Sequence, residues 1–336
     1  MRARVATRLI VGLLATGLAV SACGGRQTTS PDEDGGGGGA DAGACEAGSG
    51  RMTIATGNST GVYYVLGGGL AQLISNETDI TATAAETGAS VQNVQQLVAG
   101  DYDLAFSLAD TAADATEGTG SFDSPQPVQA LGRIYPNYTQ VVVRADSGIT
   151  SIEDMAGKTI STGSPNSGTE VIANRLLEAA GLDPSSDVQA QRLDLTKTVD
   201  GMKDGSIDGL VWSGGLPTAA MTDLFTSMGD DIAFVDITPL LPALQEINPV
   251  YTEGSIPAST YGTDAATPTV VVPNVLLVRD DLDEGTACAL TKLVYENVEA
   301  LTDVHAAAAD IDASVATEID PIPLHPGAQQ ALDELE

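Results

Sequence analysis

Two stretches of the chain carry apolar residues at the spacing of an amphipathic helix. Each follows a glycine-rich loop, in the segments "TIATGNSTGVYYVLGGGLAQLI" (53–74) and "TISTGSPNSGTEVIANRLLEAAG" (159–181). Apolar side chains then recur every three to four residues, at Val62, Leu66, Leu70 and Leu73 in the first stretch and at Ile172, Leu176, Leu177 and Ala180 in the second. The pattern predicts the same strand–loop–helix unit twice.

The likeness continues downstream of both helices. The segments "GDYDLAFS" (100–107) and "GSIDGLVWS" (205–213) each show Gly-x-x-Asp, a short apolar run and a serine. Gly57 lies 43 residues before Gly100, and Gly163 lies 42 residues before Gly205. Chance likeness between two short motifs does not explain this matched spacing. We align Thr60–Gly61 with Ser167–Gly168 and predict an α/β chain of two similar lobes with parallel strands.

Two further apolar runs are long enough to connect these lobes. The segments "YTQVVVRADSGI" (138–149) and "TPTVVVPNVLLVR" (267–279) are predicted strands that carry the chain into the second lobe and back. The first lobe then spans 51–141 and 270–336, and the second spans 142–269. Two crossings form a hinge, and a ligand cleft between two hinged lobes is the architecture of a substrate-binding protein.

The N-terminus predicts export. Three arginines precede "LIVGLLATGLAV" (9–20), an apolar run too short for an ordinary membrane span, so residues 1–22 read as a signal peptide. The following "AVSAC" resembles a bacterial lipobox, which predicts lipidation of Cys23 and anchoring on the outer face of the cell membrane. The alternative is a plain secretory signal with an incidental cysteine. Residues 23–50, rich in Gly and Asp, are a predicted flexible tether.

Two cysteines remain beyond the lipobox. Outside the cytoplasm, Cys45 and Cys288 are candidates for a disulfide that would join the start of the folded body to its C-terminal part. The alternative is a buried, inert Cys288 beside a mobile Cys45.

Charge excludes two classes of partner. The chain has 46 acidic and 14 basic residues and a formal net charge of −32, so it offers no basic surface for nucleic acid or for an anionic membrane. The two histidines, His305 and His325, lie far along the chain from every glycine-rich loop. We find no G-x-S-x-G motif, metal-spaced cluster or dinucleotide fingerprint, and therefore predict no enzyme, cofactor or metal.

The second glycine-rich loop has the spacing of a phosphate-binding loop without its cation. Gly163 and Gly168 fit G-x-x-x-x-G-K-[ST], but Thr169 replaces the lysine. Backbone N–H groups at a helix N-terminus carry about half a positive charge. We therefore predict a seat for a carboxylate, with hydroxyl groups from Thr56, Ser59, Thr60, Ser164, Ser167 and Thr169. Arg133 either adds a cation or forms a surface ion pair.

Other candidates for the cleft stand close to these loops. One of Tyr63 and Tyr64 is expected to face the ligand and the other the core. Ser90 is either a helix cap or a ligand contact, with Asn93 three residues on. Ser213, Gly214 and Gly215 end a short buried strand and allow close approach of the backbone.

In order along the chain, six segments resemble the TAXI-type solute receptors of tripartite ATP-independent periplasmic (TRAP) transporters. They are "TIATGNSTGVYYVLGGGLAQL", "TGASVQNVQQL", "DLAFSLAD", "MAGKTISTGSPNSGT", "DGSIDGLVWSGGLPT" and "PIPLHPGAQQ". The resemblance covers roughly residues 52–332. It implies a type II periplasmic-binding-protein fold that closes on a small organic anion, often a dicarboxylate such as glutamate or 2-oxoglutarate, and delivers it to an ion-driven permease.

The same resemblance implies a set of binding residues. They are Thr56, Ser59, Gly61, Tyr63, Ser90, Asn93, Ser164, Ser167 and Thr169, with Asp110 placed to receive a ligand's ammonium group. Two departures, Val65 for a usual proline and Ala109 for a usual polar residue, are interpreted as changes in the pocket wall.

We expect a monomer that captures a small organic anion. One alternative is a lipid-anchored ligand-binding component of a sensory receptor, which would use the same cleft. An extracytoplasmic hydrolase and a structural lipoprotein of the cell envelope are further alternatives.

Overall fold

The computed structural model of the chain describes residues 45–335. The predicted signal peptide, Cys23 and most of the predicted tether lie outside the described residues. Residues 45–50, which we assigned to the tether, contact the folded body, since the Gly48 N–H donates to Thr286 Oγ1 at 3.1 Å and β1 begins at Gly50. Within 45–335, no helix has the length and apolar character needed to cross a membrane.

One ten-stranded sheet runs through the described body. Eight strands follow each other in hydrogen-bonded order, namely β2 (Ile80–Ala85), β1 (Gly50–Ala55), β3 (Leu104–Leu108), β10 (Thr267–Arg279), β4 (Val128–Arg144), β7 (Gly209–Gly214), β5 (Thr159–Ser161) and β6 (Gln189–Gln191). Two more strands pair off this path, β8 (Ile232–Phe234) with β4 and β9 (Thr252–Ile256) with β10.

The predicted repeat is present in the sheet. The first repeat (50–108) runs β1, α1 (Val62–Glu77), β2, α2 (Ser90–Ala99), β3, and the second repeat (159–214) runs β5, α4 (Gly168–Ala179), β6, α5 (Leu195–Asp204), β7. In each, the first strand lies between the other two and pairs with both in parallel. The predicted α/β fold class is therefore confirmed.

The alignment of the two loops shifts by one residue from our prediction. Gly61 precedes α1 with φ −95° and ψ 160°, and Ser167 precedes α4 with φ −95° and ψ 159°. Each cap lies six residues after the end of its strand, Ala55 or Ser161. Gly61 is thus the equivalent of Ser167, not of Gly168.

The Gly-x-x-Asp motif has the same role in both repeats. Gly100 and Gly205 end α2 and α5 in the left-handed conformation that favours glycine. Three residues on, the carboxylates of Asp103 and Asp208 accept the N–H groups of Thr53 and Thr159, each at 2.8 Å. The motif stops the second helix and fixes the third strand beside the first.

Two long antiparallel strands connect the repeats. Strand β4 pairs with β10 over 128–138 and with β7 over 138–143, so one strand belongs to both ends of the sheet. It begins ten residues before the predicted strand at 138–149. The predicted lobe boundaries at 141/142 and 269/270 fall within β4 and β10, and the division into two hinged lobes stays a prediction.

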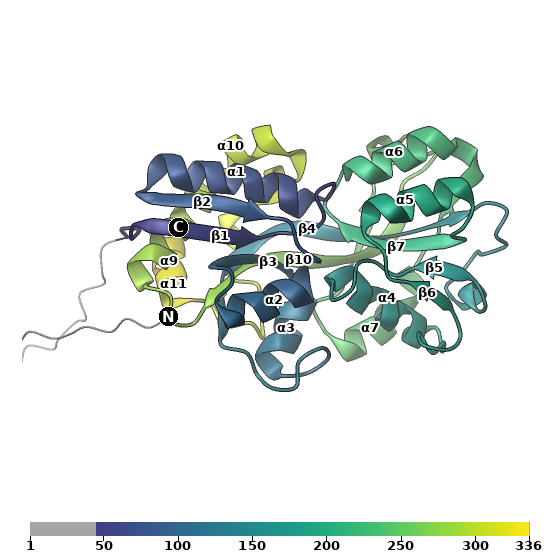
Figure 1. Cartoon of the computed structure of the whole chain (residues 1–336), viewed down its shortest axis with the longest axis horizontal. Helices are drawn as coiled ribbons and strands as arrows, with labels where there is room; N and C mark the ends of the chain where they lie inside the picture. The colour runs from purple at the N-terminus through teal and green to yellow at the C-terminus, as the bar shows by residue number, and fades with distance from the viewer. Residues whose placement is uncertain (1–44, 336) are drawn as a thin grey trace, which may run out of the picture. The chain divides into compact units, whose positions relative to one another are not determined.

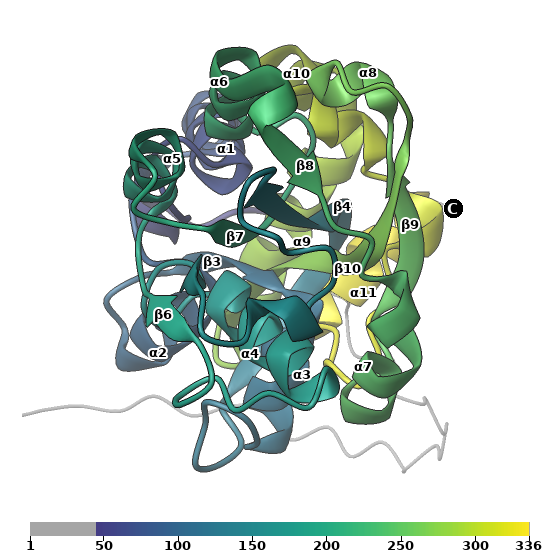
Figure 2. The same cartoon turned by 90° about the vertical axis from the view of Figure 1, so that its right-hand side faces the viewer.

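Helices cover both faces of the sheet. Figure 1 shows α1 and α10 (Val298–Val304) above the first repeat, with α2 and α3 (Ala109–Glu117) below it. In the second repeat the first helix lies below the sheet and the second above it, the reverse of the first repeat. Figure 1 shows α4 and α7 (Leu241–Ile247) below, and α5 and α6 (Ala219–Met228) above. Figure 2 places α8 (Ala258–Tyr261) near α6 and β9.

A disulfide closes the fold at the end away from the second repeat. Cys45 is bonded to Cys288 of α9 (Glu284–Glu296), which packs against α11 (Pro326–Leu335) (Figure 1). Cys288 is fully buried. The start of the folded body is therefore joined covalently to its C-terminal part.

Candidate functional site

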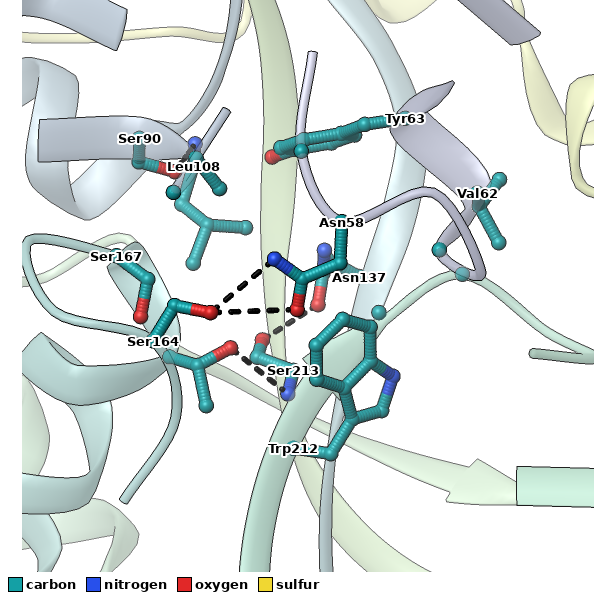
Figure 3. A pocket seen from close by; sticks show the side chains of 18 residues that line it. Asn58, Val62, Tyr63, Ser90, Leu108, Asn137, Ser164, Ser167, Trp212 and Ser213 are labelled. Carbon is teal, nitrogen blue, oxygen red and sulfur yellow. Dashed lines mark hydrogen bonds between the residues drawn. The ribbon is translucent and has the colours of Figure 1, made fainter. Parts of the chain in front are cut away.

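A pocket lies between the two repeats, at the carboxyl ends of their strands (Figure 3). This is where open α/β sheets bind ligands. Protein atoms leave about 450 Å³ of space there, part of it open to solvent. The walls are formed by Gly57, Asn58, Gly61, Val62, Tyr63, Gly88, Ala89, Ser90, Leu108, Asn137, Ser164, Ser167, Gly168, Thr169, Trp212, Ser213, Gly214 and Gly215.

Three helices begin at this pocket. The caps of α1, α2 and α4, which are Gly61, Ala89 and Ser167, all belong to its walls. The first N–H groups of a helix have no partner within the helix, and together they carry about half a positive charge. The pocket therefore faces three positive helix ends.

The described residues that line the pocket include no charged side chain. Polar groups come from four serines, Thr169, Tyr63 and the amides of Asn58 and Asn137, whereas Val62, Leu108 and Trp212 supply an apolar wall (Figure 3). Such a lining can hold an anionic group through hydrogen bonds and helix ends, and can pack an apolar ligand segment. Because this lining has no side-chain cation, the helix ends and the hydrogen-bond donors would have to balance all the negative charge of a ligand.

Eight of the twelve predicted binding residues line this pocket. They are Gly61, Tyr63, Ser90, Ser164, Ser167, Thr169, Ser213 and Gly214. Of the two neighbouring tyrosines, Tyr63 faces the pocket, but Tyr64 is exposed and does not lie in the core as predicted. The other four predicted residues, Thr56, Ser59, Asn93 and Asp110, lie outside the lining, as does Thr60, whose hydroxyl was predicted for the carboxylate seat. The binding roles of the eight stay predictions.

Thr56 and Asn93 hold strand ends together behind the pocket. The Thr56 hydroxyl donates to the Ala85 carbonyl at 2.5 Å. The Asn93 amide donates to the carbonyls of Thr56 and Phe106, at 2.7 and 2.8 Å. These bonds join the ends of β1, β2 and β3, so both side chains position the wall and do not form it. Ser59 is exposed on the loop.

Asp110 faces away from the pocket, toward Arg175 of α4. Its carboxylate accepts from the Arg175 guanidinium at 3.0 Å and from the Tyr251 hydroxyl at 2.5 Å. Burial disfavours the charged guanidinium, but the carboxylates of Asp110 and Asp114 outweigh that effect and raise the pKa of Arg175. Asp110 is therefore committed to an internal ion pair and does not offer a carboxylate to a ligand's ammonium group.

Several wall residues were missed by sequence reasoning, among them Asn58, Asn137 and Trp212. The single tryptophan directly precedes Ser213 and could have been found from that position. Asn137 lies within strand β4. Its side-chain Nδ2 donates to Asn274 Oδ1 at 3.1 Å, and its Oδ1 accepts from the Ser213 hydroxyl. Nothing in the local sequence distinguishes it.

A buried chain of polar groups supports the pocket from below. The Tyr63 hydroxyl donates to Asn274 Oδ1 at 2.6 Å, and Asn274 in turn donates to the Tyr135 carbonyl at 2.8 Å. Burial raises the pKa of Tyr63, so its hydroxyl keeps the proton that it donates. Through Asn137, this chain connects α1, β10, β4 and β7 and fixes the pocket floor.

Three further interpretations of the sequence need correction. Val65 is exposed and Ala109 is buried outside the lining, so neither departure from the family pattern changes the wall. Ser90 is not a helix cap, because it lies inside α2, whose cap is Ala89, and its hydroxyl accepts the Leu108 N–H. The other alternative for Ser90, a ligand contact, stays a prediction.

Arg133 and the search for metal ligands concern parts of the fold outside the pocket. Arg133 Nη1 lies 3.3 Å from Glu318, so Arg133 forms the surface ion pair that was one of its two predicted roles. Among residues 45–335, no group of three or more His, Cys, Asp or Glu side chains is arranged to hold a metal ion.

Comparison with known proteins identifies a family and a fold. The profile of the NMT1-like family matches residues 54–335. A protein of Bordetella bronchiseptica RB50 has a similar structure, with 17% identity, a TM-score of 0.55, and coverage of 85% of this chain and 98% of that one. The alkanesulfonate-binding protein SsuA of Xanthomonas axonopodis, solved with MOPS, shows 14% identity, 85% coverage of both chains and a TM-score of 0.46.

Another similar structure is the substrate-binding protein of an ABC uptake transporter from Streptococcus pneumoniae, solved with bound histidine. The two chains share 16% identity, and the match covers 80% of this chain and 94% of that one, with a TM-score of 0.49. At such identities the likeness concerns the fold alone.

Proposed function

The chain belongs to the NMT1-like family, and we propose that it is an extracytoplasmic solute-binding receptor that encloses a small organic anion between its two repeats. The observation that carries this proposal is the pocket in which three helix N-termini meet polar side chains and a tryptophan. We propose binding without chemical conversion of the ligand. The lining has serine hydroxyls, but none of its residues is a histidine or a carboxylate that could activate them as a base.

The proposed ligand is a carboxylate compound. One carboxylate would accept N–H and hydroxyl groups at the start of α4, where Ser167, Gly168 and Thr169 line the pocket. The ligand's carbon chain would pack against Leu108 and Trp212, and a second carboxylate would face the N-termini of α1 and α2. Dicarboxylates such as glutamate and 2-oxoglutarate are the first candidates from the family resemblance. Because Asp110 is occupied by Arg175, we favour the 2-oxo acid over the amino acid.

The proposed partner is an ion-driven permease of the TRAP type. Support comes from the six segments that resemble TAXI-type receptors and from the predicted lipidation of Cys23, which would keep the receptor at the outer face of the cell membrane. In this role the protein acts as a monomer that delivers its ligand to the permease. A sensory receptor component would use the same pocket.

Titration of the protein with candidate acids tests the proposal. The protein is unfolded and refolded to remove carried-over ligand, and 2-oxoglutarate, glutamate and simple monocarboxylates are then added while Trp212 fluorescence is followed. Since Trp212 is the chain's single tryptophan and lines the pocket, binding there should change its emission. A saturable change with a carboxylate supports the proposal, and an unchanged emission and melting temperature across the panel would reject the anion-receptor assignment.

A further inference from the structure

Asn58 connects the loop of the first repeat to the second repeat. It lies between β1 and α1, yet its side chain bonds to two groups across the pocket. Its Oδ1 accepts the Leu195 N–H at 3.1 Å, and its Nδ2 donates to the Ser164 hydroxyl at 3.1 Å (Figure 3 shows the second bond). Asn58 and Ser164 both line the pocket.

The loop of the second repeat makes the equivalent connection in the opposite direction. Asn166 lies between β5 and α4, and its carbonyl accepts the Gln92 N–H of α2 at 2.9 Å. Leu195 opens α5 and Gln92 lies in the first turn of α2, and these are the second helices of their repeats. Each glycine-rich loop therefore bonds an N-terminal amide of the other repeat's second helix.

These bonds satisfy amides that the helices cannot satisfy themselves. The first-turn N–H groups of a helix have no carbonyl partner within it. Helix α2 has Ala89 as its cap, which offers no side-chain acceptor. In α5 the cap Asp194 accepts from Lys197, and the N–H of the buried Leu195 is bonded by Asn58. Separation of the repeats would remove both bonds at once.

We propose that Asn58 is a positioning residue that couples closure of the pocket to reciprocal capping of α2 and α5. A ligand contacts a wall that contains Asn58 and Ser164, so the groups that enclose it are the groups that hold the two repeats together. This inference rests on the proposed function in one respect, namely that a solute is enclosed by closure. The capping bonds themselves join protein groups alone.

Amide hydrogen exchange of the ligand-free protein tests the coupling. In Asn58→Ala, the Leu195 amide should exchange about tenfold faster, which is the effect of losing roughly one buried hydrogen bond. The Gln92 amide should also exchange faster, although its acceptor, the Asn166 carbonyl, is unchanged. Ser59→Ala, an exposed neighbour on the same loop, is the matched control and should leave both rates at the wild-type value.

Asn58→Asp tests whether loss of the Leu195 hydrogen bond, and not a general disturbance of the loop, causes the faster exchange. The aspartate keeps acceptors for the Leu195 N–H and for the Ser164 hydroxyl, so exchange at Leu195 and Gln92 should stay near wild type. Equal acceleration in the Asp and Ala variants would overturn the proposal. So would acceleration confined to Leu195, or a wild-type Leu195 amide that exchanges as fast as in Asn58→Ala.

The test is independent of the ligand assignment. A protein that binds none of the candidate acids would still show correlated protection of Leu195 and Gln92 if the coupling is correct. A protein that binds 2-oxoglutarate but shows no correlated change would keep the proposed function and lose this inference.

Discussion

Nη2 of Arg175, on α4, donates to both carboxylate oxygens of Asp114, on α3, at 2.8 and 2.6 Å. Helix α3 directly follows the first repeat, and α4 belongs to the second, so the ion pair joins the two ends of the sheet. Asp110 completes the cluster with a further bond at 3.0 Å. All three side chains are at least nine-tenths buried.

Removal of the cation should destabilise the fold strongly. Arg175→Met leaves Asp110 and Asp114 buried without their partner, which we expect to lower the free energy of unfolding by about 3–5 kcal/mol. Urea denaturation measures this. The control is Arg133→Met, which breaks the more exposed pair with Glu318 (side-chain exposure 26% and 63%) and should cost far less. Equal losses would show that the buried cluster contributes little.

The start of α4 should dominate binding of the carboxylate. We expect Thr169→Val and Ser167→Ala each to weaken 2-oxoglutarate binding by about 1–3 kcal/mol, because each removes a polar group from the proposed carboxylate site. Calorimetric titration gives the affinities. Ser167 also caps α4 by accepting the Glu170 N–H, so the stability of that variant is measured in parallel. Unchanged affinity in both variants would remove this loop from the binding site.

The disulfide should contribute to stability and not to binding. Replacement of Cys45 and Cys288 by serine should lower the free energy of unfolding by about 2–4 kcal/mol, since the bond closes a long loop in the unfolded chain. Neither cysteine lines the pocket, so ligand affinity should stay the same. Thermal unfolding with and without reductant gives the first quantity, and a titration of the double variant gives the second.

His305 should make stability depend on pH. Its Nδ1 accepts the Ala307 N–H at 3.1 Å and its Nε2 donates to the Pro217 carbonyl, an arrangement that requires a neutral ring. Burial lowers the pKa of His305. The folded state therefore binds fewer protons than the unfolded state just below the ordinary histidine pKa, and stability should fall as the pH drops through about 6.5 toward the folded pKa.

Unfolding curves at about pH 5 and about pH 7.5 test this dependence. His305→Gln keeps a donor for Pro217 and should show a smaller loss at the lower pH than wild type. His325 provides a matched comparison, because its Nδ1 accepts the Gly327 N–H, its Nε2 faces the Leu282 carbonyl, and burial also lowers its pKa. An identical pH slope in wild type and His305→Gln would contradict the role of His305.

The repeat could be predicted from the sequence because its determinants are local. Glycines at helix ends and aspartates that bond a neighbouring strand leave the same mark in both copies, and the equal spacing reveals parallel strands. The loops after β1 and β5 were recognised for the same reason. The predicted alignment of the loops was wrong by one residue. Gly61 and Ser167 adopt the same cap conformation, but they are different residue types, so matching residue types did not align them.

The remaining errors concern partners distant in sequence. Asp110 stands in a position that suggests a ligand contact, but Arg175, which occupies it, lies 65 residues away. Asn58 bonds Leu195 only because the repeats face each other across the pocket, at a separation of 137 residues. Strand β4 began earlier than predicted because its first part, "VQALGRIYPN" (128–137), is interrupted by polar residues and glycine that pair with β10.

The bond between Cys45 and Cys288 also determines how the fold carries mechanical load. Tension applied to the chain ahead of Cys45 passes through the sulfur atoms into α9 before it reaches β1, which begins at Gly50. Without that bond, the same pull would act on the first residues of β1 and strip them from β2, one hydrogen bond after another. With it, the force enters α9, which packs against α11 in the C-terminal part of the fold.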